Sequence, residues 1–289
     1  MKICQQVLIN ILIHAIISCG VIMERKINKI KLFINDDNKS KEVGEKLKEE
    51  LLNNSFLIDD DNFDLAISVG GDGSFLRMVK ENEFNQNIYY IGVNSGTLGF
   101  LQEIDINKTK DFIERLNDNN YKIEELSILE SNVYTKDNVY KFDCLNEIVI
   151  RKNDFSILKT NVYIDNELLE NFTGDGLLIS TSTGSTAYNM SFKGSIVYNT
   201  INTLQITPIA PINNKAYNTL TNSIVIPNDK VVSLSNEKED NLFFMVDGKN
   251  YFLDNVYKIE NKISMKKIKC LRMNDFHFIK IVHEKIVEK

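Results

Sequence analysis

Two short apolar segments, each ending in a glycine-bearing loop, constrain the fold of this chain more than any other feature of its sequence. Residues 64–69 (DLAISV) run into Gly70-Gly71, and residues 88–93 (IYYIGV) run into a second loop with glycines. Short apolar runs without alternation are typical of strands that are buried on both faces of a parallel sheet. Ligands of open α/β sheets bind beyond the carboxyl ends of such strands, so the two loops predict a cleft at one edge.

Further elements around these runs complete an open α/β domain. Residues 30–34 suit a strand, and residues 40–54 suit a helix because their apolar positions recur on one face. Residues 74–80 can begin a second helix, and Thr109 can cap a third. The apolar faces of the first and third helices comprise Val43, Leu47, Leu51, Phe112, Ile113 and Leu116. Alternation of strands and helices predicts a parallel sheet covered by helices.

The sequence changes in character after Glu124. Segments rich in Val, Ile, Tyr and Phe follow one another, and turn dipeptides such as Asp165-Asn166 separate them, which favours β-structure. One helix is expected near residues 185–192. The expected strands are 126–135, 139–151, 156–170, 177–182, 223–226, 230–235, 242–253 and 256–268.

Length and composition indicate two domains behind a short extension. A chain of 289 residues, 43% of them hydrophobic, has material for two packed cores. We expect an open α/β domain at 23–124, a β-rich domain at 125–268, and a tail at 269–289 that can pack back on the first. Residues 1–22 are mostly apolar, but polar residues interrupt them and no A-x-A cleavage site follows. We expect a dispensable extension or an early start codon there, rather than a signal peptide or a membrane span.

Charge and cysteine content argue against two classes of partner. A formal net charge of -6 disfavours non-specific nucleic-acid binding, which needs a positive field, but allows small phosphate ligands. The four cysteines are scattered, with no CxxC pair, and the three histidines lie far from any cysteine pair, so no metal site is expected. Unpaired thiols are typical of a reducing compartment, so we expect a cytoplasmic protein without a membrane partner.

The first candidate site is Gly70-Gly71-Asp72-Gly73-Ser74, at the expected junction of a buried strand and a helix. Glycines let the backbone approach a pyrophosphate with exposed N–H groups, and a helix start favours an anion. The Asp72 carboxylate could accept a proton from an attacking hydroxyl or hold a Mg²⁺ that bridges phosphates. From these residues alone, a tight turn in which Asp72 caps the helix is as compatible as a phosphate site.

Two further constellations could line the same cleft. In residues 94–101 (NSGTLGFL), Phe100 could cover a base or ribose, unless the apolar residues of this loop only fill the core. Asn146-Glu147 interrupts an apolar strand (CLNEIVI), so the two side chains face opposite sides of it. A buried one would need a partner, and a ligand hydroxyl or base amine would serve. The alternative is an exposed Glu147 at a sheet edge.

The longest constellation covers residues 173–189 (TGDGLLISTSTGSTAYN). Hydroxyl and backbone groups of residues 183–186 offer donors and acceptors to an adenine edge, Ala187 leaves room, and Tyr188 can stack. A polar capping turn with Tyr188 in the core explains so extended a pattern less well. Asp247-Gly248 differs, because between two apolar strands it is the expected type I′ hairpin turn. Physical reasoning alone favours a turn over a ligand contact there.

Taken together, GGDGS, NSGTLGFL, NE and TGDGLLISTSTGSTAYN, in this order and at these spacings, resemble the NAD kinase family, particularly its bacterial form. The similarity covers about residues 28–265. GGDG also occurs in lipid kinases and phosphofructokinases, whereas the GSTAY block is more specific. The resemblance implies a two-domain enzyme, α/β followed by β-rich, that phosphorylates the 2′-hydroxyl of the adenosine ribose of NAD with ATP and Mg²⁺. It also implies a homo-oligomer, a dimer or tetramer whose subunits contribute to each other's sites.

The resemblance further assigns roles to single residues. Asp72 would be the general base, and the backbone of Gly70, Gly71 and Gly73 would hold ATP. The residues implied to contact NAD are Asp72, Gly73, Phe100, Asn146, Glu147, Asp175, Thr186, Ala187, Tyr188, Ala210, Ile212 and Asp247. Three positions depart from the family pattern. Thr173 stands where many relatives carry Arg, Ser182 stands where Pro is common, and Gly248 stands where some relatives have a larger residue.

Two other functions stay open at this point. A lipid or sugar kinase would share GGDG but leave the GSTAY block unexplained. A non-catalytic dinucleotide sensor would bind NAD without needing the carboxylate of Asp72. The sequence distinguishes neither NAD from NADH as acceptor nor ATP from polyphosphate as donor.

Overall fold

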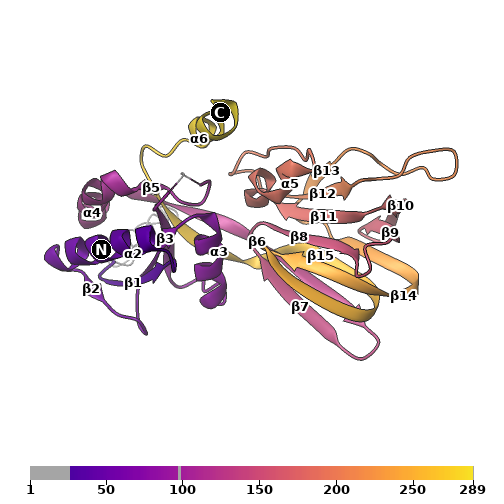
Figure 1. Cartoon of the computed structure of the whole chain (residues 1–289), viewed down its shortest axis with the longest axis horizontal. Coiled ribbons are helices and arrows are strands. Elements are labelled where there is room, and N and C mark those ends of the chain that lie inside the picture. Colours follow the sequence, from indigo (N-terminus) through magenta and orange to yellow (C-terminus); the bar gives the residue numbers. More distant parts are fainter. Residues whose placement is uncertain (1–26, 97–98, 289) are drawn as a thin grey trace, which may run out of the picture.

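A computed structural model describes residues 27–96 and 99–288 of this chain. Figure 1 shows an α/β half, coloured indigo to magenta, beside a β-rich half, coloured magenta to yellow. Within the described residues, one sheet of 15 strands runs through both halves. The expected extension at residues 1–22 lies outside the described residues, as do Thr97 and Leu98 of the second glycine-bearing loop.

The α/β half contains a parallel sheet, as the buried apolar runs predicted. The strands are β1 (Lys29–Ile34), β2 (Leu57–Ile58), β3 (Leu65–Gly70), β4 (Tyr89–Asn94) and β5 (Ile104–Asp105), paired in the order β2-β1-β3-β4-β5. The helices are α2 (Asn38–Asn53), α3 (Asp72–Glu81) and α4 (Thr109–Asn117), with a 3-10 turn, η1 (Ile106–Lys108), before α4. All residues of β3 and β4 are buried, because helices cover both faces of the sheet.

The two faces of this sheet have separate cores. Ile67 packs with α2 and α4 on one face, whereas its neighbour Ala66 packs with α3 on the other. The apolar helix faces expected from the sequence are buried in the first core. The expected cap at Thr109 is wrong, because Thr109 is the first residue of α4. Asp105 provides the cap one turn earlier, where its carboxylate accepts a hydrogen bond from the Asn107 N–H.

The second half is predominantly β-structure, as predicted. Its strands are β6 (Tyr121–Thr135), β7 (Val139–Cys144), β8 (Glu147–Lys152), β9 (Leu158–Ile164), β10 (Glu167–Gly174), β11 (Gly176–Thr181), β12 (Thr203–Ile209), β13 (Ile224–Pro227), β14 (Val232–Val246) and β15 (Lys249–Met273). The central order is β13-β12-β11-β8-β14-β15, with antiparallel pairing throughout. The expected helix near residues 185–192 is a 3-10 turn, η2 (Thr183–Thr186), followed by a one-turn helix, α5 (Tyr188–Ser191).

Strand β12 was not expected from the sequence. Polar residues interrupt its apolar pattern, and Pro208 is unusual in the middle of a sheet. The structure compensates for the buried polar groups individually. The Gln205 side chain accepts a hydrogen bond from the Ser195 N–H at 2.6 Å, and the Thr207 hydroxyl donates to the Asn189 side chain at 2.5 Å. The tertiary structure determines these partners, so the local sequence pattern could not predict that β12 is a strand.

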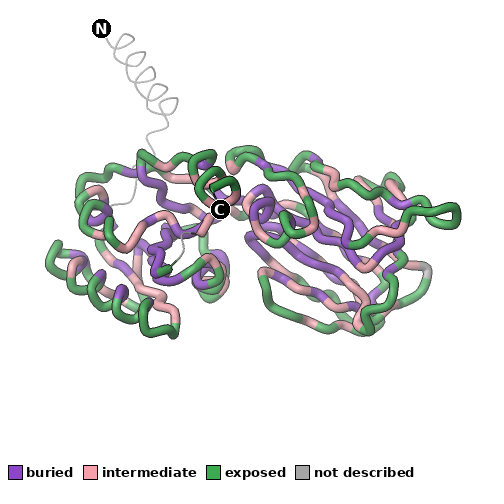
Figure 2. Tube along the Cα trace, turned by 45° about the horizontal axis from the view of Figure 1, so that its top comes forward, coloured by how far each residue is buried: buried purple, intermediate pink, exposed green. Residues whose placement is uncertain are grey.

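Two long strands join the halves. β6 and β15 are antiparallel neighbours along much of their length, and Lys269 and Cys270 near the end of β15 pair in parallel with β4. The last turns, α6 (Phe278–Val282) and η3 (His283–Val287), lie over the junction of the two halves in both ribbon views (Figures 1 and 2). Figure 2 shows buried residues concentrated in the strands of both halves. None of the described helices is long and apolar enough to cross a membrane.

Candidate active site

The GGDG segment lies where β3 ends and α3 begins, as predicted. Gly71 is the residue before the helix, and Asp72 is the first residue inside it. The alternative of Asp72 as a helix cap is therefore wrong. A Cβ placed on Gly71 or Gly73 would meet no atom within 4 Å, so both backbones face open space. Open backbone at the carboxyl edge of a parallel sheet, directly before a helix, is the place where phosphates commonly bind.

The Asp72 carboxylate contacts the second glycine-bearing loop. One oxygen accepts a hydrogen bond from the Phe100 N–H at 2.9 Å, and the other accepts one from the Leu101 N–H at 3.0 Å. A Cβ on Gly99 would lie 1.8 Å from an Asp72 oxygen, so this close approach requires glycine. The two loops expected to form one cleft are therefore in direct contact through Asp72.

Gln102 is a residue that sequence reasoning missed. Its side-chain amide donates to the Gly71 carbonyl at 2.6 Å and to the Ser68 hydroxyl at 3.0 Å. A Cβ on Gly92 of β4 would lie 2.1 Å from the Gln102 side chain, so glycine leaves room for it. The signal available in the sequence was a single polar residue, Gln102, directly after the apolar residues Phe100 and Leu101. Gln102 fixes the backbone of the GGDG turn from behind.

Asp247 combines the expected turn with an unexpected contact. Asp247 and Gly248 have φ values of 45° and 79°, as a type I′ turn requires, and they join β14 to β15. The carboxylate points inward and accepts hydrogen bonds from the N–H groups of Leu145 at 2.7 Å, Asn146 at 2.9 Å and Glu147 at 3.3 Å. The turn interpretation is confirmed, and the same residue also positions the Asn146-Glu147 pair.

Asn146 and Glu147 are both buried, at 6% and 4% exposure, which rules out the alternative of an exposed edge residue. Among the described residues, Asn146 Oδ1 and Glu147 Oε2 have no hydrogen-bond partner. Burial and the nearby Asp247 charge raise the pKa of Glu147 to about 8, although the Tyr188 backbone N–H donates to its carboxyl group. Unpartnered buried polar atoms are costly, so they indicate a place for a polar ligand.

The GSTAY block lies beside this pair. Thr181 donates its hydroxyl hydrogen to the Leu145 carbonyl at 2.6 Å, which ties the end of β11 to the strand before Asn146. Tyr188 is 39% exposed, and its ring lies edge-on to Phe192 at 4.8 Å between ring centroids, so it is not a core residue. A small cavity is lined on one side by Phe100 and on the other by Thr183 and Thr186, which brings the two halves of the predicted cleft together.

The remaining predicted residues lie elsewhere. Asp175 precedes β11, is about half exposed, and forms an ion pair with Arg151 at 3.6 Å. Near it, Ile212 donates its N–H to the Thr173 carbonyl at 2.8 Å, and Ala210 has a positive φ of 43°. Strand β11, with six residues roughly 20 Å long at 3.3 Å per residue, separates this group from Thr183–Thr186. The structure thus places the Asp175 group at the end of β11 opposite to the GSTAY block.

Known proteins with this arrangement form one family. Residues 1–121 match the model of the ATP-NAD kinase N-terminal domain, and residues 145–267 match that of the ATP-NAD kinase C-terminal domain. The NAD kinase of Finegoldia magna is 39% identical over 262 residues, which cover 87% of this chain and 96% of that protein. NAD kinase 2 of Halalkalibacterium halodurans is 32% identical over 255 residues, covering 87% and 95%. The chain belongs to the NAD kinase family.

Solved structures share this NAD kinase fold. The crystal structure of yeast NADH kinase complexed with NADH superposes with a TM-score of 0.78 at 21% identity, covering 91% of this chain and 88% of that one. An NAD kinase from Archaeoglobus fulgidus in complex with ATP gives a TM-score of 0.69 at 19% identity, covering 85% and 94%. The predicted architecture, an α/β domain followed by a β-rich domain, is confirmed.

Two of the three departures from the NAD kinase pattern, Thr173 and Ser182, have hydrogen-bond partners of their own. Thr173 is 5% exposed, and its N–H donates to the Thr219 hydroxyl at 3.3 Å. Ser182 donates its hydroxyl hydrogen to the Ile201 carbonyl and lies 3.2 Å from the Thr203 hydroxyl. Neither residue contacts Asp72, so the two departures leave the predicted catalytic group unchanged.

Proposed function

We propose that this protein is an ATP-dependent NAD kinase that phosphorylates the 2′-hydroxyl of the adenosine ribose of NAD, with Asp72 as general base. The carrying observation is that Asp72, fixed beside open glycine backbones, is hydrogen-bonded to Phe100, and that Phe100 lines one cavity with Thr186 of the GSTAY block. That block packs against the segment with the unpartnered polar atoms of Asn146 and Glu147. The relatives named NAD kinase at up to 39% identity support the same activity. A lipid kinase or sugar kinase would leave the GSTAY side of the cleft without a ligand.

Asp72 has the hydrogen bonds that a base needs. The Phe100 and Leu101 N–H groups fix the orientation of its carboxylate, and each oxygen keeps lone-pair capacity for a further hydrogen bond. A ribose hydroxyl placed there would donate its proton to Asp72 as its oxygen bonds to the terminal phosphorus of ATP, while the bond from that phosphorus to the bridging oxygen breaks and ADP leaves. Positioned bases of this kind contribute about 10²–10⁴-fold to rates.

The neighbouring residues divide between the two substrates. We assign the exposed backbones of Gly71 and Gly73, with Gly70, to the phosphates of ATP. Asn146 Oδ1 and Glu147 suit the adenosine part of NAD, because a hydroxyl or amine would satisfy their unpartnered atoms. The further NAD contacts in this proposal are Phe100, Thr186, Ala187, Tyr188 and Asp247.

The described residues fit a divalent metal that arrives with ATP. They include no cluster of three or more His, Cys, Asp or Glu side chains that could form a resident metal site. Mg²⁺ in phosphotransferases is commonly held by one or two carboxylates together with substrate phosphates, and Asp72 beside the open glycines offers such a carboxylate. When bound, Mg²⁺ would neutralise charge on the transferred phosphoryl group.

The proposed activity is tested by incubating the purified protein with Mg-ATP and NAD, then measuring NADP with a coupled dehydrogenase. Parallel reactions replace NAD with NADH, diacylglycerol or fructose 6-phosphate, and ATP with polyphosphate. We expect NADP from NAD and no product from the lipid or the sugar. Binding of NAD without NADP formation would indicate a sensor instead, and a phosphorylated lipid or sugar would overturn the acceptor assignment.

Glu147→Gln should stabilise the ligand-free protein at neutral and alkaline pH. Because the folded-state pKa of Glu147 is about 8, the folded protein keeps a proton there that the unfolded chain releases above its ordinary pKa of about 4.3. The wild type therefore loses stability as pH rises from about 4 to about 8, and the variant avoids that loss. Urea unfolding at pH 5, 7 and 9 should show an advantage that grows to roughly 2–4 kcal/mol. An advantage independent of pH would contradict this.

We also propose that the protein is a homo-oligomer, a dimer or tetramer formed through the β-rich half. Asp175 before β11, and Ala210 and Ile212 after β12, lie at the end of these strands opposite to Thr183–Thr186, so they suit the site of a neighbouring subunit. Phe155 and Phe252 are 68% and 60% exposed on the same half, a surface that favours burial. Light scattering should give a mass of at least twice the chain mass of 33.2 kDa. A fully active monomer at micromolar concentration would refute the proposal.

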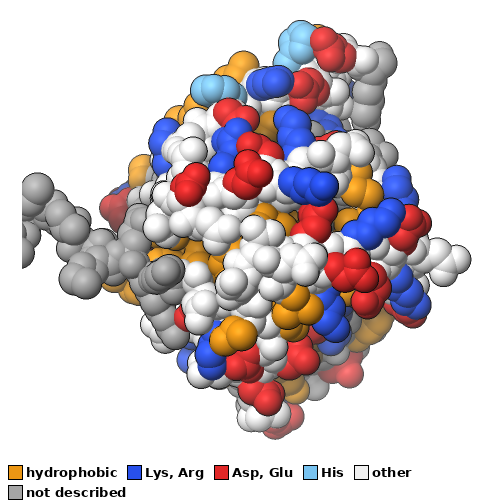
Figure 3. Space-filling view, turned by 90° about the vertical axis from the view of Figure 1, so that its left-hand side faces the viewer, with side chains coloured by type: hydrophobic (Ala, Val, Ile, Leu, Met, Phe, Trp, Pro, Cys, Tyr) orange, Lys and Arg blue, Asp and Glu red, His pale blue; other side chains and the backbone are white. Residues whose placement is uncertain are grey.

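The location we propose is the cytoplasm. Cys144 and Cys270, the two described cysteines, are free and buried, which suits a reducing compartment. Positive and negative side chains are interspersed over the outer face of the α/β half (Figure 3). Such a surface does not provide the continuous positive field that attracts nucleic acid.

A further inference from the structure

A buried cluster of three charged side chains lies at the junction of the two halves. Arg272, near the end of β15, donates from Nε to Glu124 at 2.5 Å and from Nη1 to Glu103 at 3.2 Å. The side chains are 10% exposed for Arg272, 14% for Glu124 and 6% for Glu103. The Met273 N–H also donates to Glu103 at 2.5 Å. The three residues come from β15, β6 and the segment before β5.

Glu103 ends the segment that holds the proposed base. Within four residues of this short segment, Phe100 and Leu101 donate their N–H groups to Asp72, and Gln102 donates to the Gly71 carbonyl. The Glu103 N–H itself donates to the Gly92 carbonyl of β4 at 3.0 Å. The segment is therefore fixed at one end by the GGDG turn and at the other by Arg272.

Arg272 also lines the small cavity between Phe100 and Thr186. Its guanidinium lies 4.4 Å from the ring centre of Phe276, and Phe276 lines the small cavity that also contains Phe100 and Thr186. Glu124, the second partner of Arg272, accepts a hydrogen bond from the Asn199 side chain on the connection after the GSTAY block. One guanidinium thus contacts groups on both sides of the proposed site.

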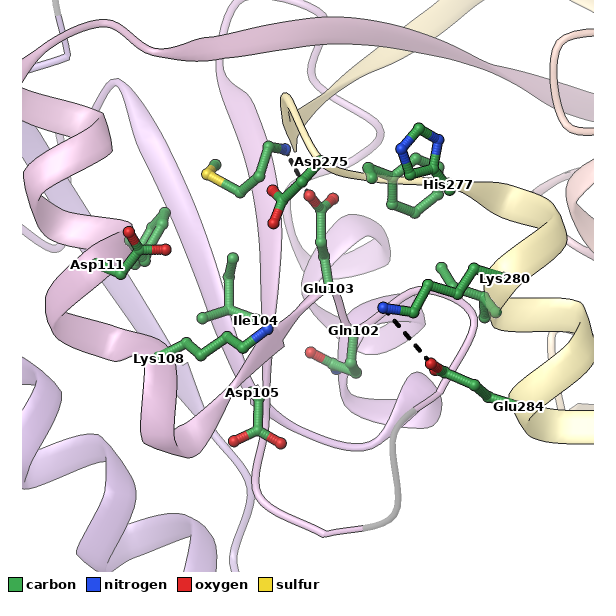
Figure 4. A pocket seen from close by; sticks show the side chains of 14 residues that line it. Gln102, Glu103, Ile104, Asp105, Lys108, Asp111, Asp275, His277, Lys280 and Glu284 are labelled. Carbon is green, nitrogen blue, oxygen red and sulfur yellow. Dashed lines mark hydrogen bonds and ion pairs between the residues drawn. The ribbon is translucent and has the colours of Figure 1, made fainter. Parts of the chain in front are cut away.

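Figure 4 shows Glu103 between α4 and the C-terminal helix, where it lines a depression whose far wall carries the Lys280–Glu284 ion pair. Two carboxylates and one guanidinium buried together are not an efficient way to gain stability, since apolar residues of similar size often do as well. Such a charged cluster instead fixes the relative positions of the segments that carry its side chains. Arg272 offers two donor directions, and the carboxylates on the two sides of the junction accept them.

We propose that Arg272 is a positioning residue for phosphoryl transfer, which acts through Glu103 on the loop that orients the Asp72 carboxylate. This inference rests on the proposed NAD kinase activity. Arg272 touches neither substrate in this proposal. It holds Glu103, Glu103 fixes the Phe100–Leu101 backbone, and that backbone holds Asp72.

Arg272→Lys should lower kcat by about tenfold at saturating NAD and ATP, because small displacements of a catalytic group are costly. Lysine keeps the positive charge between the two carboxylates but cannot reproduce the two donor directions of the guanidinium. KM for NAD should stay within about threefold of wild type, since the proposed NAD contacts are untouched. Thermal unfolding of each variant measures the folded fraction, so that kcat is referred to folded enzyme.

Two substitutions at Glu103 separate positioning from general stability. Glu103→Ala removes the carboxylate and should lower kcat about as much as Arg272→Lys. Glu103→Gln keeps one acceptor oxygen, for either Arg272 or Met273 but not for both, so it should restore kcat in part, to a value between those of Glu103→Ala and the wild type. The double variant Arg272→Lys/Glu103→Ala should lose no more than the worse single variant, because both act through one contact.

Arg115→Lys is the matched control. Arg115 also binds two carboxylates, Asp111 at 2.9 Å and Asp275 at 2.8 Å, but it does not contact the loop of Asp72. Its kcat should equal that of the wild type. A wild-type kcat for Arg272→Lys, or additive losses in the double variant, would overturn the positioning role while leaving the NAD kinase activity intact. Absence of NADP formation by the wild-type protein would instead refute the proposed function.

Discussion

Asp72→Asn should lower kcat for NADP formation by about 10²–10⁴-fold, the usual contribution of a positioned general base. The amide keeps the size of the side chain but cannot accept the ribose proton. It can still accept one hydrogen bond from the Phe100 or Leu101 N–H, while its NH₂ group faces the other donor. KM for NAD should change little, because Asn can still hydrogen-bond a hydroxyl.

The measurement is a steady-state assay of NADP formation with both substrates saturating, together with thermal unfolding of the variant. Asp175→Asn is the matched control, since Asp175 follows a glycine in the second GDG and is half exposed. In a single subunit Asp175 lies at the end of β11 opposite to the GSTAY block, so its variant should act mainly on KM. If Asp72→Asn turned over NAD at a near wild-type rate, the base would be Asp175 or Glu147. The proposed NAD site could still stand in that case.

Asp247→Ala should destabilise the protein by about 3–5 kcal/mol, because it removes the acceptor of three N–H groups at once. The hydrogen bonds come from Leu145, Asn146 and Glu147, and their loss would release the segment that carries the proposed adenosine contacts. For a chain of this size the melting temperature should fall by roughly 10 °C. KM for NAD should rise as well. Asp247→Asn should be milder, since a type I′ turn accepts Asn and the amide oxygen still accepts.

Asp165→Ala is the matched control for Asp247→Ala. Asp165 has the same place in the two-residue turn between β9 and β10, with a φ of 50° against 45° for Asp247. Alanine is equally strained at both positions, so that cost cancels. Asp165 is exposed and bonds Lys230 and the Val231 N–H at the surface, so its variant should lose much less stability than Asp247→Ala. Equal losses of stability in the two variants would show that the hydrogen bonds to the inward carboxylate of Asp247 add no stability beyond that of an exposed turn.

Local sequence patterns determined the main features of this protein. The apolar runs before Gly70-Gly71 and before Asn94 were sufficient to predict β3 and β4, because a strand buried on both faces must be apolar throughout. The glycines after them predicted open backbone at the strand ends, and Asp247-Gly248 predicted its turn. Each of these signals lies within a few residues, so no knowledge of distant contacts was needed.

Only the tertiary structure decided what these residues contact. Asp72 accepts from residues 28 and 29 positions further along the chain, and Asp247 accepts from residues about 100 positions before it. Arg272 binds Glu103 across 169 positions. Side chains so far apart carry no mutual periodicity or spacing, because their meeting depends on how whole strands pair. The sequence therefore determined which loops could hold a nucleotide, and the pairing of β6, β15 and β4 decided which carboxylates, donors and charges meet there.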